Sequence, residues 1–425
     1  MIDIRAYSKH LFLFATAIIV GTNAEGQTTN SQRAEELQLN TITTAVPFLL
    51  ITPDSRAGGM GDAGVASLND VNAVHWNASK LGFTKKKMGF GVSYTPWLRA
   101  LVPDINLAYI TGFYQMKKKG TIAGSLRYFS LGDITFTDAN GQVIGQFRPN
   151  EFALDVAYGV KLADNFSVGG AVRYINSNLT GNALVESSQT HAGRTVAVDI
   201  SALYKKEKVK LADKKAVVGI GLNISNIGGK MSYSDRGQAN STDFIPINLR
   251  LGGSLNVELD DYNSISVLAD INKLMVPTPP IYKYEVDPIT GQTTGEIATD
   301  ADGNPIIESG KDPNRGVAEG MFGSFSDAPG GGKEELRELN YSAGLEYWYN
   351  HLFAVRAGYF YEHPTKGNRQ FFTIGAGVKY NVFGLDFAYL IPTQQRNPLE
   401  NTLRFTLTFD FDAFKDQNKE EVKTE

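Results

Sequence analysis

The sequence predicts an all-β fold, namely a 14-stranded antiparallel transmembrane β-barrel with an N-terminal plug in its lumen. Two patterns support this prediction. Long segments alternate apolar residues with small or polar ones, and the connections between these segments are long and short in turn. Composition agrees, because 43 glycines and 11% aromatic residues among 425 suit a sheet-rich chain better than a helical one.

The charge and the cysteine content exclude several classes of function. A net charge of -4 gives no broad basic field, so we expect no nucleic acid partner. Cysteine is absent, which removes disulfides, thiolate metal sites and cysteine nucleophiles. The five histidines contain no pair at i, i+3 or i, i+4, and we therefore expect neither a metal site nor a cofactor.

Residues 1–26 have the pattern of a secretory signal peptide. Arg5 and Lys9 precede the apolar run 11–20, and Ala24 and Gly26 are small residues suited to cleavage. The run is too short to cross a bilayer, and no later segment approaches about 18 consecutive apolar residues. A buried helix of a cytosolic protein is the alternative, but nothing amphipathic follows the run. We expect export and, given the barrel, an outer-membrane location.

Fourteen segments show the two-residue period of a strand. In the last one, Phe405, Leu407 and Phe409 share one face, while Thr406 and Thr408 share the other. Most segments are nine to thirteen residues long, which suits tilted strands that cross a bilayer. The predicted strands cover residues 86–94, 105–116, 119–129, 150–161, 165–176, 194–205, 214–226, 246–258, 263–272, 340–349, 352–362, 370–380, 383–391 and 402–411.

The connections between these strands alternate in length. The stretches 95–104 and 130–149 are long, whereas 117–118 is short. Outer-membrane barrels have this arrangement, with long loops outside the cell and tight turns in the periplasm. The longest connection, 273–339, is therefore predicted to be extracellular.

Residues 27–84 do not fit the strand pattern. The polar stretch 27–40 suits a mobile terminus, and the small residues of 43–66 suit a chain packed tightly inside a barrel. We predict a lumen plug in which Arg56 makes a buried charge-assisted contact. The plug residues are Pro47, Phe48, Arg56, Gly58, Gly59, Gly61, Asp62 and Gly64. The chain thus divides into a signal peptide (1–26), an N-terminal segment with the plug (27–84), the barrel (85–411) and a charged tail (412–425).

Apparent catalytic motifs do not fit their context. Residues 59–64 match G-x-G-x-x-G, but Pro53 interrupts any preceding strand. Asp300, Asp302 and Asn304 could hold a cation loosely, although a solvated turn is the more ordinary explanation. No Ser-His-Asp or paired-carboxylate constellation is apparent, and we expect no enzymatic activity.

The stretch 47–81 carries a resemblance to a known family. It reads PFL at 47–49, PDSRAGGMGDAG at 53–64 and AVHWNASKL at 73–81. These motifs are similar to those of the PorV components of the type IX protein secretion system, within the FadL-like group of 14-stranded barrels with an N-terminal hatch. One departure is Asn77-Ala78-Ser79, where the family has Asn-Pro-Ala, so the resemblance does not carry over a rigid turn there.

The resemblance implies a non-enzymatic role in protein export. It implies that cargo with a C-terminal secretion domain is received from a large translocon barrel and carried to a surface attachment complex. The implied partners are the translocon barrel, the cargo secretion domains, the attachment complex and outer-membrane lipid. The alternative is a FadL-like transporter of hydrophobic small molecules, and it stays open because either Arg127 or Tyr128 could face the lumen.

Apolar runs in the predicted extracellular loops indicate a protein partner. Exposed apolar patches usually mark interfaces. The alternative is that these side chains fold back over the barrel mouth or lie at the membrane interface. The predicted partner-binding residues are Trp97, Leu98, Leu101, Phe244, Ile245, Met321 and Phe322, with Trp97 as the central anchor.

Overall fold

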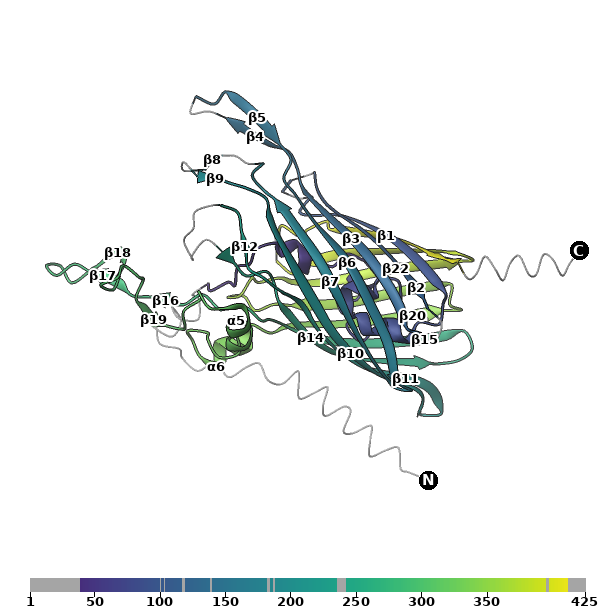
Figure 1. Cartoon of the computed structure of the whole chain (residues 1–425). Coiled ribbons are helices and arrows are strands. Elements are labelled where there is room, and N and C mark those ends of the chain that lie inside the picture. Colours follow the sequence, from purple (N-terminus) through teal and green to yellow (C-terminus); the bar gives the residue numbers. More distant parts are fainter. Residues whose placement is uncertain are drawn as a thin grey trace, which may run out of the picture. The chain divides into compact units, whose positions relative to one another are not determined.

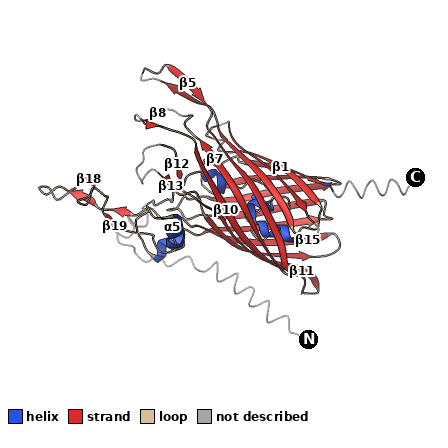
Figure 2. Ribbon diagram, viewed as in Figure 1, coloured by secondary structure: helices blue, strands red, loops and turns tan. Residues whose placement is uncertain are grey.

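In the computed structural model, fourteen strands close into one antiparallel barrel (Figures 1 and 2). They follow one another around the wall in sequence order, and β1 pairs with β24 to close it. The predicted 14-stranded barrel is confirmed. Its strands are β1 (Met88–Pro96), β2 (Ile105–Gln115), β3 (Thr121–Leu131), β6 (Asn150–Ala163), β7 (Phe166–Asn178), β10 (Gly193–Leu211), β11 (Lys214–Gly228), β14 (Asn248–Glu258), β15 (Asn263–Leu274), β20 (Asn340–Tyr349), β21 (Phe353–Tyr361), β22 (Gln370–Tyr380), β23 (Phe383–Pro392) and β24 (Leu403–Asp410).

The structure describes residues 39–99, 101–102, 104–116, 119–137, 140–181, 184–185, 188–234, 242–394 and 397–411. The predicted signal peptide (1–26) and the charged tail (412–425) lie outside the described residues. So does most of the polar stretch that follows the signal peptide.

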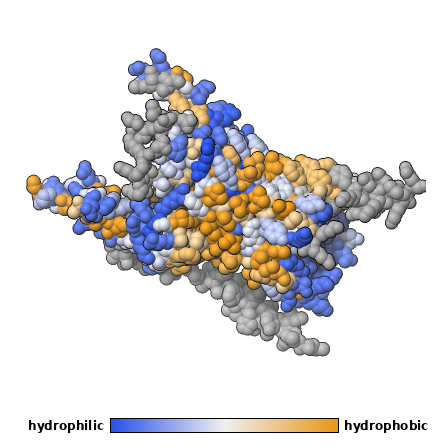
Figure 3. Space-filling model, in the orientation of Figure 1, coloured by the Kyte–Doolittle hydropathy of each residue, from blue (hydrophilic) through white to orange (hydrophobic). Residues whose placement is uncertain are grey.

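The alternation of residues places polar side chains inside the barrel and apolar ones outside. On β24, Arg404 and Thr406 are buried inside, while Phe405 and Leu407 are exposed on the outer face. Each barrel strand exposes apolar residues in this way, and Figure 3 shows part of the resulting belt in orange. A closed barrel also pairs its backbone groups, as lipid requires. Among the described residues, no helix is long and apolar enough to cross a bilayer.

The long connections leave the barrel at one end, here called the mouth (Figure 1). Among the described residues the other end has only tight turns, as predicted; that the mouth faces the outside of the cell stays a prediction. The described residues of the mouth loops form two short helices and five small two-stranded sheets. These are α5 (Val317–Gly323) and α6 (Gly332–Arg337), with β4 (Ile134–Thr137) paired to β5 (Val143–Phe147), β8 (Leu184–Val185) to β9 (Ser188–Gln189), β12 (Met231–Ser232) to β13 (Thr242–Asp243), β16 (Ile281–Tyr282) to β19 (Ile307–Ser309) and β17 (Tyr284–Val286) to β18 (Thr293–Ile297).

One barrel strand is longer than the sequence pattern predicts. β10 continues past the predicted end at residue 205 and pairs with β11 as far as Leu211 and Lys214. The register shifts between Lys206 and Val209, where Lys208 has a φ of 60°. The extension has polar residues on both faces beyond the apolar belt. The two-residue period therefore disappears although backbone pairing continues.

Residues 40–84 run from the mouth into the barrel and are here called the luminal segment (Figures 1 and 2). Asp54 and Asn77 fix the starts of two of its helices, because their side chains accept the amide hydrogens of Ala57 and Ser79 at 2.9 and 3.0 Å. Asn77 thus supports a turn without a following proline. The helices of the segment are η1 (Pro47–Leu50), α3 (Ser55–Gly58), α4 (Ala73–Trp76) and η2 (Ala78–Phe83).

Candidate functional site in the lumen and at the mouth

The luminal segment is bonded to the barrel wall around most of the circumference. Inward-facing residues of nine strands form hydrogen bonds with it. One bond lies at the seam that closes the barrel, where Ser55 N donates to Thr406 Oγ1 of β24 at 2.9 Å, and Ser93 of β1 bonds the same hydroxyl at 2.8 Å. The wall residues are Thr111, Arg127, Ser167, Ser201, Ser254, Asp270, Glu346, Thr373 and Thr406.

Arg56 links the luminal segment to the wall by charge. Its Nη2 lies 2.8 Å from Glu346 Oε1 on β20, and its Nη1 lies 2.8 Å from Asp70 Oδ2 within the segment. The buried Glu346 is also 2.7 Å from Arg356 Nε on β21, which pairs in turn with Asp386 on β23 at 2.7 Å. Every charge in this chain of contacts therefore has a neighbour of opposite sign, as buried charges require.

Two glycines allow close packing of the luminal segment, Gly61 against the wall and Gly64 within the segment. Gly61 has a φ of +66°, and a Cβ there would lie 2.6 Å from the backbone N and O of Tyr359 on β21. A Cβ on Gly64 would lie 2.3 Å from the ring of Trp76. Both distances are too short for a non-bonded contact, so a larger residue at either position would force the segment to move.

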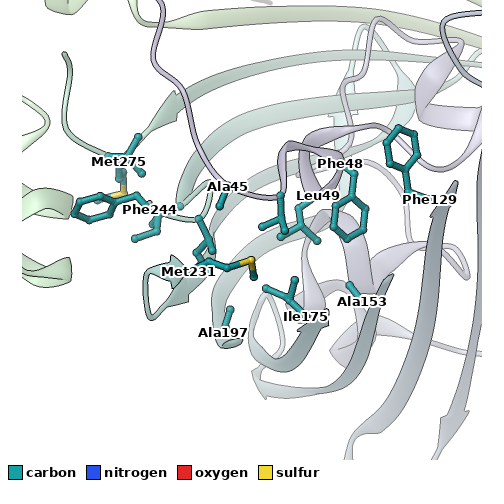
Figure 4. Packing of buried hydrophobic residues seen from close by; sticks show 14 of the residues in the cluster. Ala45, Phe48, Leu49, Phe129, Ala153, Ile175, Ala197, Met231, Phe244 and Met275 are labelled. Atoms are coloured by element: carbon teal, nitrogen blue, oxygen red, sulfur yellow. The ribbon is translucent and has the colours of Figure 1, made fainter. Parts of the chain in front are cut away.

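An apolar cluster holds the part of the luminal segment nearest the mouth (Figure 4). Phe48 stacks on Phe129 of β3 with ring centroids 6.1 Å apart, and Leu49 is buried beside it. The same cluster includes Ile245 and Met275 from the mouth loops. Burial of each such side chain stabilises the structure by about 1.5–3 kcal/mol.

All eight predicted plug residues lie in the luminal segment. Pro47 begins η1, and Asp62 pairs with Arg404 of β24 at 2.9 Å. Whether the segment blocks passage through the barrel stays a prediction. The eight are Pro47, Phe48, Arg56, Gly58, Gly59, Gly61, Asp62 and Gly64.

A cavity of about 400 Å³ lies at the mouth between residues 41–52 of the luminal segment and the barrel wall. Its lining includes the stacked rings of Phe360 and Phe371, whose centroids are 4.9 Å apart, and the Arg369 guanidinium lies 5.4 Å from the ring centre of Phe360. It also includes charged residues, among them Arg250 and Arg404. The arrangement can hold a molecule that has both an apolar and a charged part.

A group of ion pairs, here called the mouth cluster, fixes α6 to the barrel. Lys273 of β15 lies 2.6 Å from Glu338 and 3.0 Å from Glu335, while Lys366 lies 2.5 Å from Glu334 and 3.0 Å from Glu338. Burial opposes the charge of Glu334, but hydrogen bonds from Lys366 and from the Gly330 amide outweigh burial and hold the pKa of Glu334 below its usual range. The cluster is defined by Lys273, Glu334, Glu335, Glu338 and Lys366.

Several of the predicted partner-binding residues are not exposed, so the predicted exposure is wrong for them. Phe244 is 9% exposed and Ile245 is 1% exposed, and both belong to the apolar cluster. Trp97, predicted to be the outward anchor, is half-buried and lines the mouth cavity. These loops fold back over the mouth, because their apolar side chains find partners there. Leu98 and Met321 are also half-buried against apolar clusters.

Two of the predicted residues do face solvent. Leu101 in the first mouth loop is 63% exposed, and Phe322 on α5 is 69% exposed. No contact in the structure shows a partner at either of them. Partner binding at these residues therefore stays a prediction.

Several buried polar contacts of the luminal segment were not predicted from the sequence. Trp76 Nε1 donates to Asp54 Oδ2 at 2.6 Å, and the buried Lys80 donates to the Gly64 carbonyl at 3.2 Å. No periodic pattern marks such contacts, because the segment has no long regular element. By contrast, charged wall residues such as Glu346 stand on the polar face of a strand, and this position could have identified them.

No metal centre is apparent in the part of the chain that the structure describes. Within it, no three His, Asp or Glu side chains gather closely enough to hold a metal ion. In the loop that could hold a cation, Asp300 Oδ1 accepts the amide hydrogens of Asp302 and Asn304, both at 2.9 Å. These bonds are those of an ordinary turn.

Comparison with known families identifies the family of this barrel, whose lumen holds the luminal segment. The model of a family described as "Type IX secretion system protein PorV" matches residues 33–281. The chain belongs to the PorV family. The resemblance of residues 47–81 to PorV is thus confirmed, and this PorV-family barrel resides in the outer membrane and belongs to the type IX secretion system.

Solved structures similar to this PorV-family chain are barrels with low sequence identity to it. The deltaS2S3 mutant of the monoaromatic hydrocarbon channel TodX is 14% identical, with a TM-score of 0.48, and the match covers 84% of this chain and 99% of that chain. The Pseudomonas putida toluene transporter TodX is 13% identical, with a TM-score of 0.42 and coverage of 87% and 98%. A Pseudomonas aeruginosa FadL homologue is 12% identical, with a TM-score of 0.41 and coverage of 88% and 100%. No curated protein matches significantly.

Proposed function

We propose that this protein is a cargo shuttle of the type IX secretion system. It accepts proteins with C-terminal secretion domains from the translocon barrel at its mouth and delivers them to the surface attachment complex. The observation that carries the proposal is the bonding of the luminal segment to the barrel wall. Because this segment is bonded to nine strands, the mouth rather than the lumen is the surface available for exchange.

The bonding of the luminal segment supports a binding protein over an open channel. Clearing a path through the barrel would separate Arg56 from Glu346 and Asp62 from Arg404. Separating the members of a buried ion pair leaves each charge without its partner, which is costly unless water reaches both. The proposal therefore assigns no transport path to the lumen and no catalytic role to any residue.

The alternative function is a FadL-like transporter of hydrophobic small molecules. The apolar residues that line the mouth cavity favour it, because Trp97, Phe360, Phe371 and Leu399 would suit a hydrophobic ligand. Such a transporter must open a path past the luminal segment. Its activity should depend on residues of the lumen, whereas a shuttle should depend on residues exposed at the mouth.

Exposed apolar side chains at the mouth provide the surface that a shuttle needs. Leu101, Phe322 and Leu336 of α6 are each more than 60% exposed. Exposed apolar residues of this kind often dominate the affinity of a protein interface. In this proposal they replace Trp97 as the residues that anchor the partner, because Trp97 is half-buried.

The double variant Leu101→Asp with Phe322→Asp tests the proposal. We expect a heat-modifiable barrel that inserts normally but recovers little translocon or cargo in pull-downs from native membranes, and that displays less surface-attached cargo. Ile289→Asp is the control, because Ile289 is 92% exposed at the tip of the β17–β18 hairpin and should tolerate the change.

Two results would count against the proposal in different ways. Equal recovery of partners by the double variant and the wild type would show that Leu101 and Phe322 are not the interface. If the wild type recovers no translocon, and cargo reaches the surface without this protein, the shuttle role itself is wrong.

A further inference from the structure

The cationic side chains that line the mouth cavity outnumber the anionic ones. Four cationic and three anionic side chains line it. The cations are Arg250, Lys366, Arg369 and Arg404, and the anions are Asp62, Glu338 and Glu362.

Three of the four cations have an anion of the cavity as a partner. Arg404 lies 2.9 Å from Asp62, and Lys366 lies 3.0 Å from Glu338. Arg369 donates two hydrogen bonds to Glu362, both at 2.8 Å. These pairs involve all three anions of the cavity lining. Arg250 is therefore the one cation of the lining without an anionic partner in it.

Arg250 of β14 is only 7% exposed and lines the cavity. Its Nε donates to Asn272 Oδ1 at 2.8 Å, and its guanidinium lies 4.6 Å from the ring centre of Trp76. Within the described ranges, no carboxylate comes within 4.0 Å of it and its two terminal nitrogens form no hydrogen bond. Asp270 on the adjacent strand forms no ion pair with Arg250 either, although its charge favours the guanidinium; its Oδ2 accepts hydrogen bonds from the amides of Gly64 and Val65 at 2.7 and 3.0 Å.

A buried guanidinium that lacks an anion is costly, because desolvation is not repaid by an ion pair. Its planar pair of terminal nitrogens matches a carboxylate. Arg250 therefore has the geometry of a binding residue for an incoming carboxylate, and the wall around it fixes its position.

The apolar part of the cavity lining indicates what carries this carboxylate. Phe360 and Phe371 stack at 4.9 Å, and Trp97 and Leu399 extend the apolar surface beside them. A cavity of about 400 Å³ has room for a few side chains and not for a folded domain. The occupant is thus the end of a chain with apolar groups near its carboxylate.

The luminal segment adds a feature that suits a polypeptide. Residues 41–44 line the cavity without helix or strand, between the amide of Asn40, which bonds Thr365 O at 3.0 Å, and the amide of Ala45, which bonds Phe244 O at 2.9 Å. Between these two anchors, no backbone group of 41–44 is hydrogen-bonded to another described residue. Free backbone groups of this kind can pair with an incoming extended peptide.

We propose that the mouth cavity binds the C-terminal carboxylate of an exported polypeptide, with Arg250 as its charged partner. The inference rests on the proposed shuttle function and deepens it, because it names the part of the cargo that enters the cavity. The last few residues lie along 41–44, and their apolar side chains lie against Phe360 and Phe371.

The test measures binding of a fluorescent heptapeptide that ends in Leu-Val-Leu to the purified protein in nanodiscs. Three ligands are compared: the peptide with a free carboxylate, the same peptide as a C-terminal amide, and octanoate as a competitor. We expect the amide to bind at least about tenfold more weakly than the free acid. Octanoate should not displace the peptide at matched concentrations, since it lacks a backbone.

Arg250→Gln should weaken binding of the free acid by about tenfold or more and leave binding of the amide unchanged. Arg250→Lys should bind with intermediate affinity, because it keeps the charge and loses the planar pair of nitrogens. Arg148→Gln is the matched control, since Arg148 pairs with Asp133 on the exposed β4–β5 loop. Heat-modifiable migration confirms that each variant is folded.

Equal affinity for acid and amide in the wild type would overturn the proposal without reference to any variant. So would complete displacement by octanoate, which would identify a small carboxylic acid as the ligand. Peptide binding uses purified protein, whereas the shuttle role is tested by recovery of the translocon. A wild type that recovers the translocon and ignores the peptide would thus refute this inference alone.

Discussion

Ion pairs in the lumen contribute more to the stability of the protein than ion pairs at the surface do. Arg56 contacts Glu346, which is inaccessible to solvent, whereas Arg148 and Asp133 are both largely exposed. Exposed pairs contribute about 0–1 kcal/mol, because water and salt screen them. Loss of one member of a buried pair leaves an uncompensated charge and costs several times more.

Arg56→Ala is therefore expected to destabilise the protein by about 3–5 kcal/mol. The thermal transition in detergent, followed by heat-modifiable gel migration, should occur at a clearly lower temperature. Arg148→Ala should leave it almost unchanged. If the two variants unfold at the same temperature, the luminal charges do not hold the segment.

Gly61→Ala tests the close approach of the luminal segment to β21. An added Cβ would meet the Tyr359 backbone at 2.6 Å in a left-handed conformation, so the segment should detach locally and become sensitive to protease. Gly332→Ala is the control, because nothing lies within 4 Å of a Cβ there. Equal protection of both variants in limited proteolysis would contradict the close contact.

The orientation of single residues was predictable only where a strand repeats. Arg127 is buried inside and Tyr128 is exposed outside, which resolves the ambiguity that the pattern left. Trp97 could not be placed, because its burial depends on loop contacts with residues far along the chain. The imbalance that isolates Arg250 likewise appears only when all charges of the cavity are in place.

Among the elements, the barrel strands were predictable and the loops were not. Lipid outside and a packed lumen inside impose a two-residue period, so the ends of the predicted strands lie within two residues of the observed ones except at the polar end of β10. The luminal segment and the mouth loops have no such constraint. Their contacts join residues that no local pattern connects, such as Lys273 and Glu335.

The β17–β18 hairpin should be removable without loss of the barrel. The amide of Ala298 bonds Lys283 O at 2.8 Å, so residues 284–297 can be replaced by a Gly-Gly turn. We expect the thermal transition of this variant to match that of the wild type. Deletion of 278–336 should keep the barrel but lower its transition, because Glu334 and Glu335 leave the mouth cluster.

A shared transition temperature for the short and the long deletion would contradict the role of the mouth cluster. Loss of heat-modifiable migration in the short deletion would contradict the strand assignment, since the hairpin lies outside the barrel wall.

At the level of the whole molecule, the filled lumen should prevent ion flow. In planar bilayers we expect little steady conductance from the unmodified protein, because the luminal segment is bonded around the wall. Arg56→Ala should show frequent openings as the segment loosens. A large and stable conductance of the unmodified protein would refute closure of the lumen.

The bond between Ser55 and Thr406 joins residues 351 positions apart at the seam between β1 and β24. A residue near the beginning of the chain thus depends, for this contact, on a strand near its end. Bringing such distant residues together costs about 5 kcal/mol of chain entropy in a free polymer, and the hairpins formed in between reduce this cost by shortening the effective loop. An unfinished wall offers Ser55 no hydroxyl to bind, so this one contact forms only when the barrel closes, and we expect full protection of residues around Ser55 from protease to mark the completion of assembly.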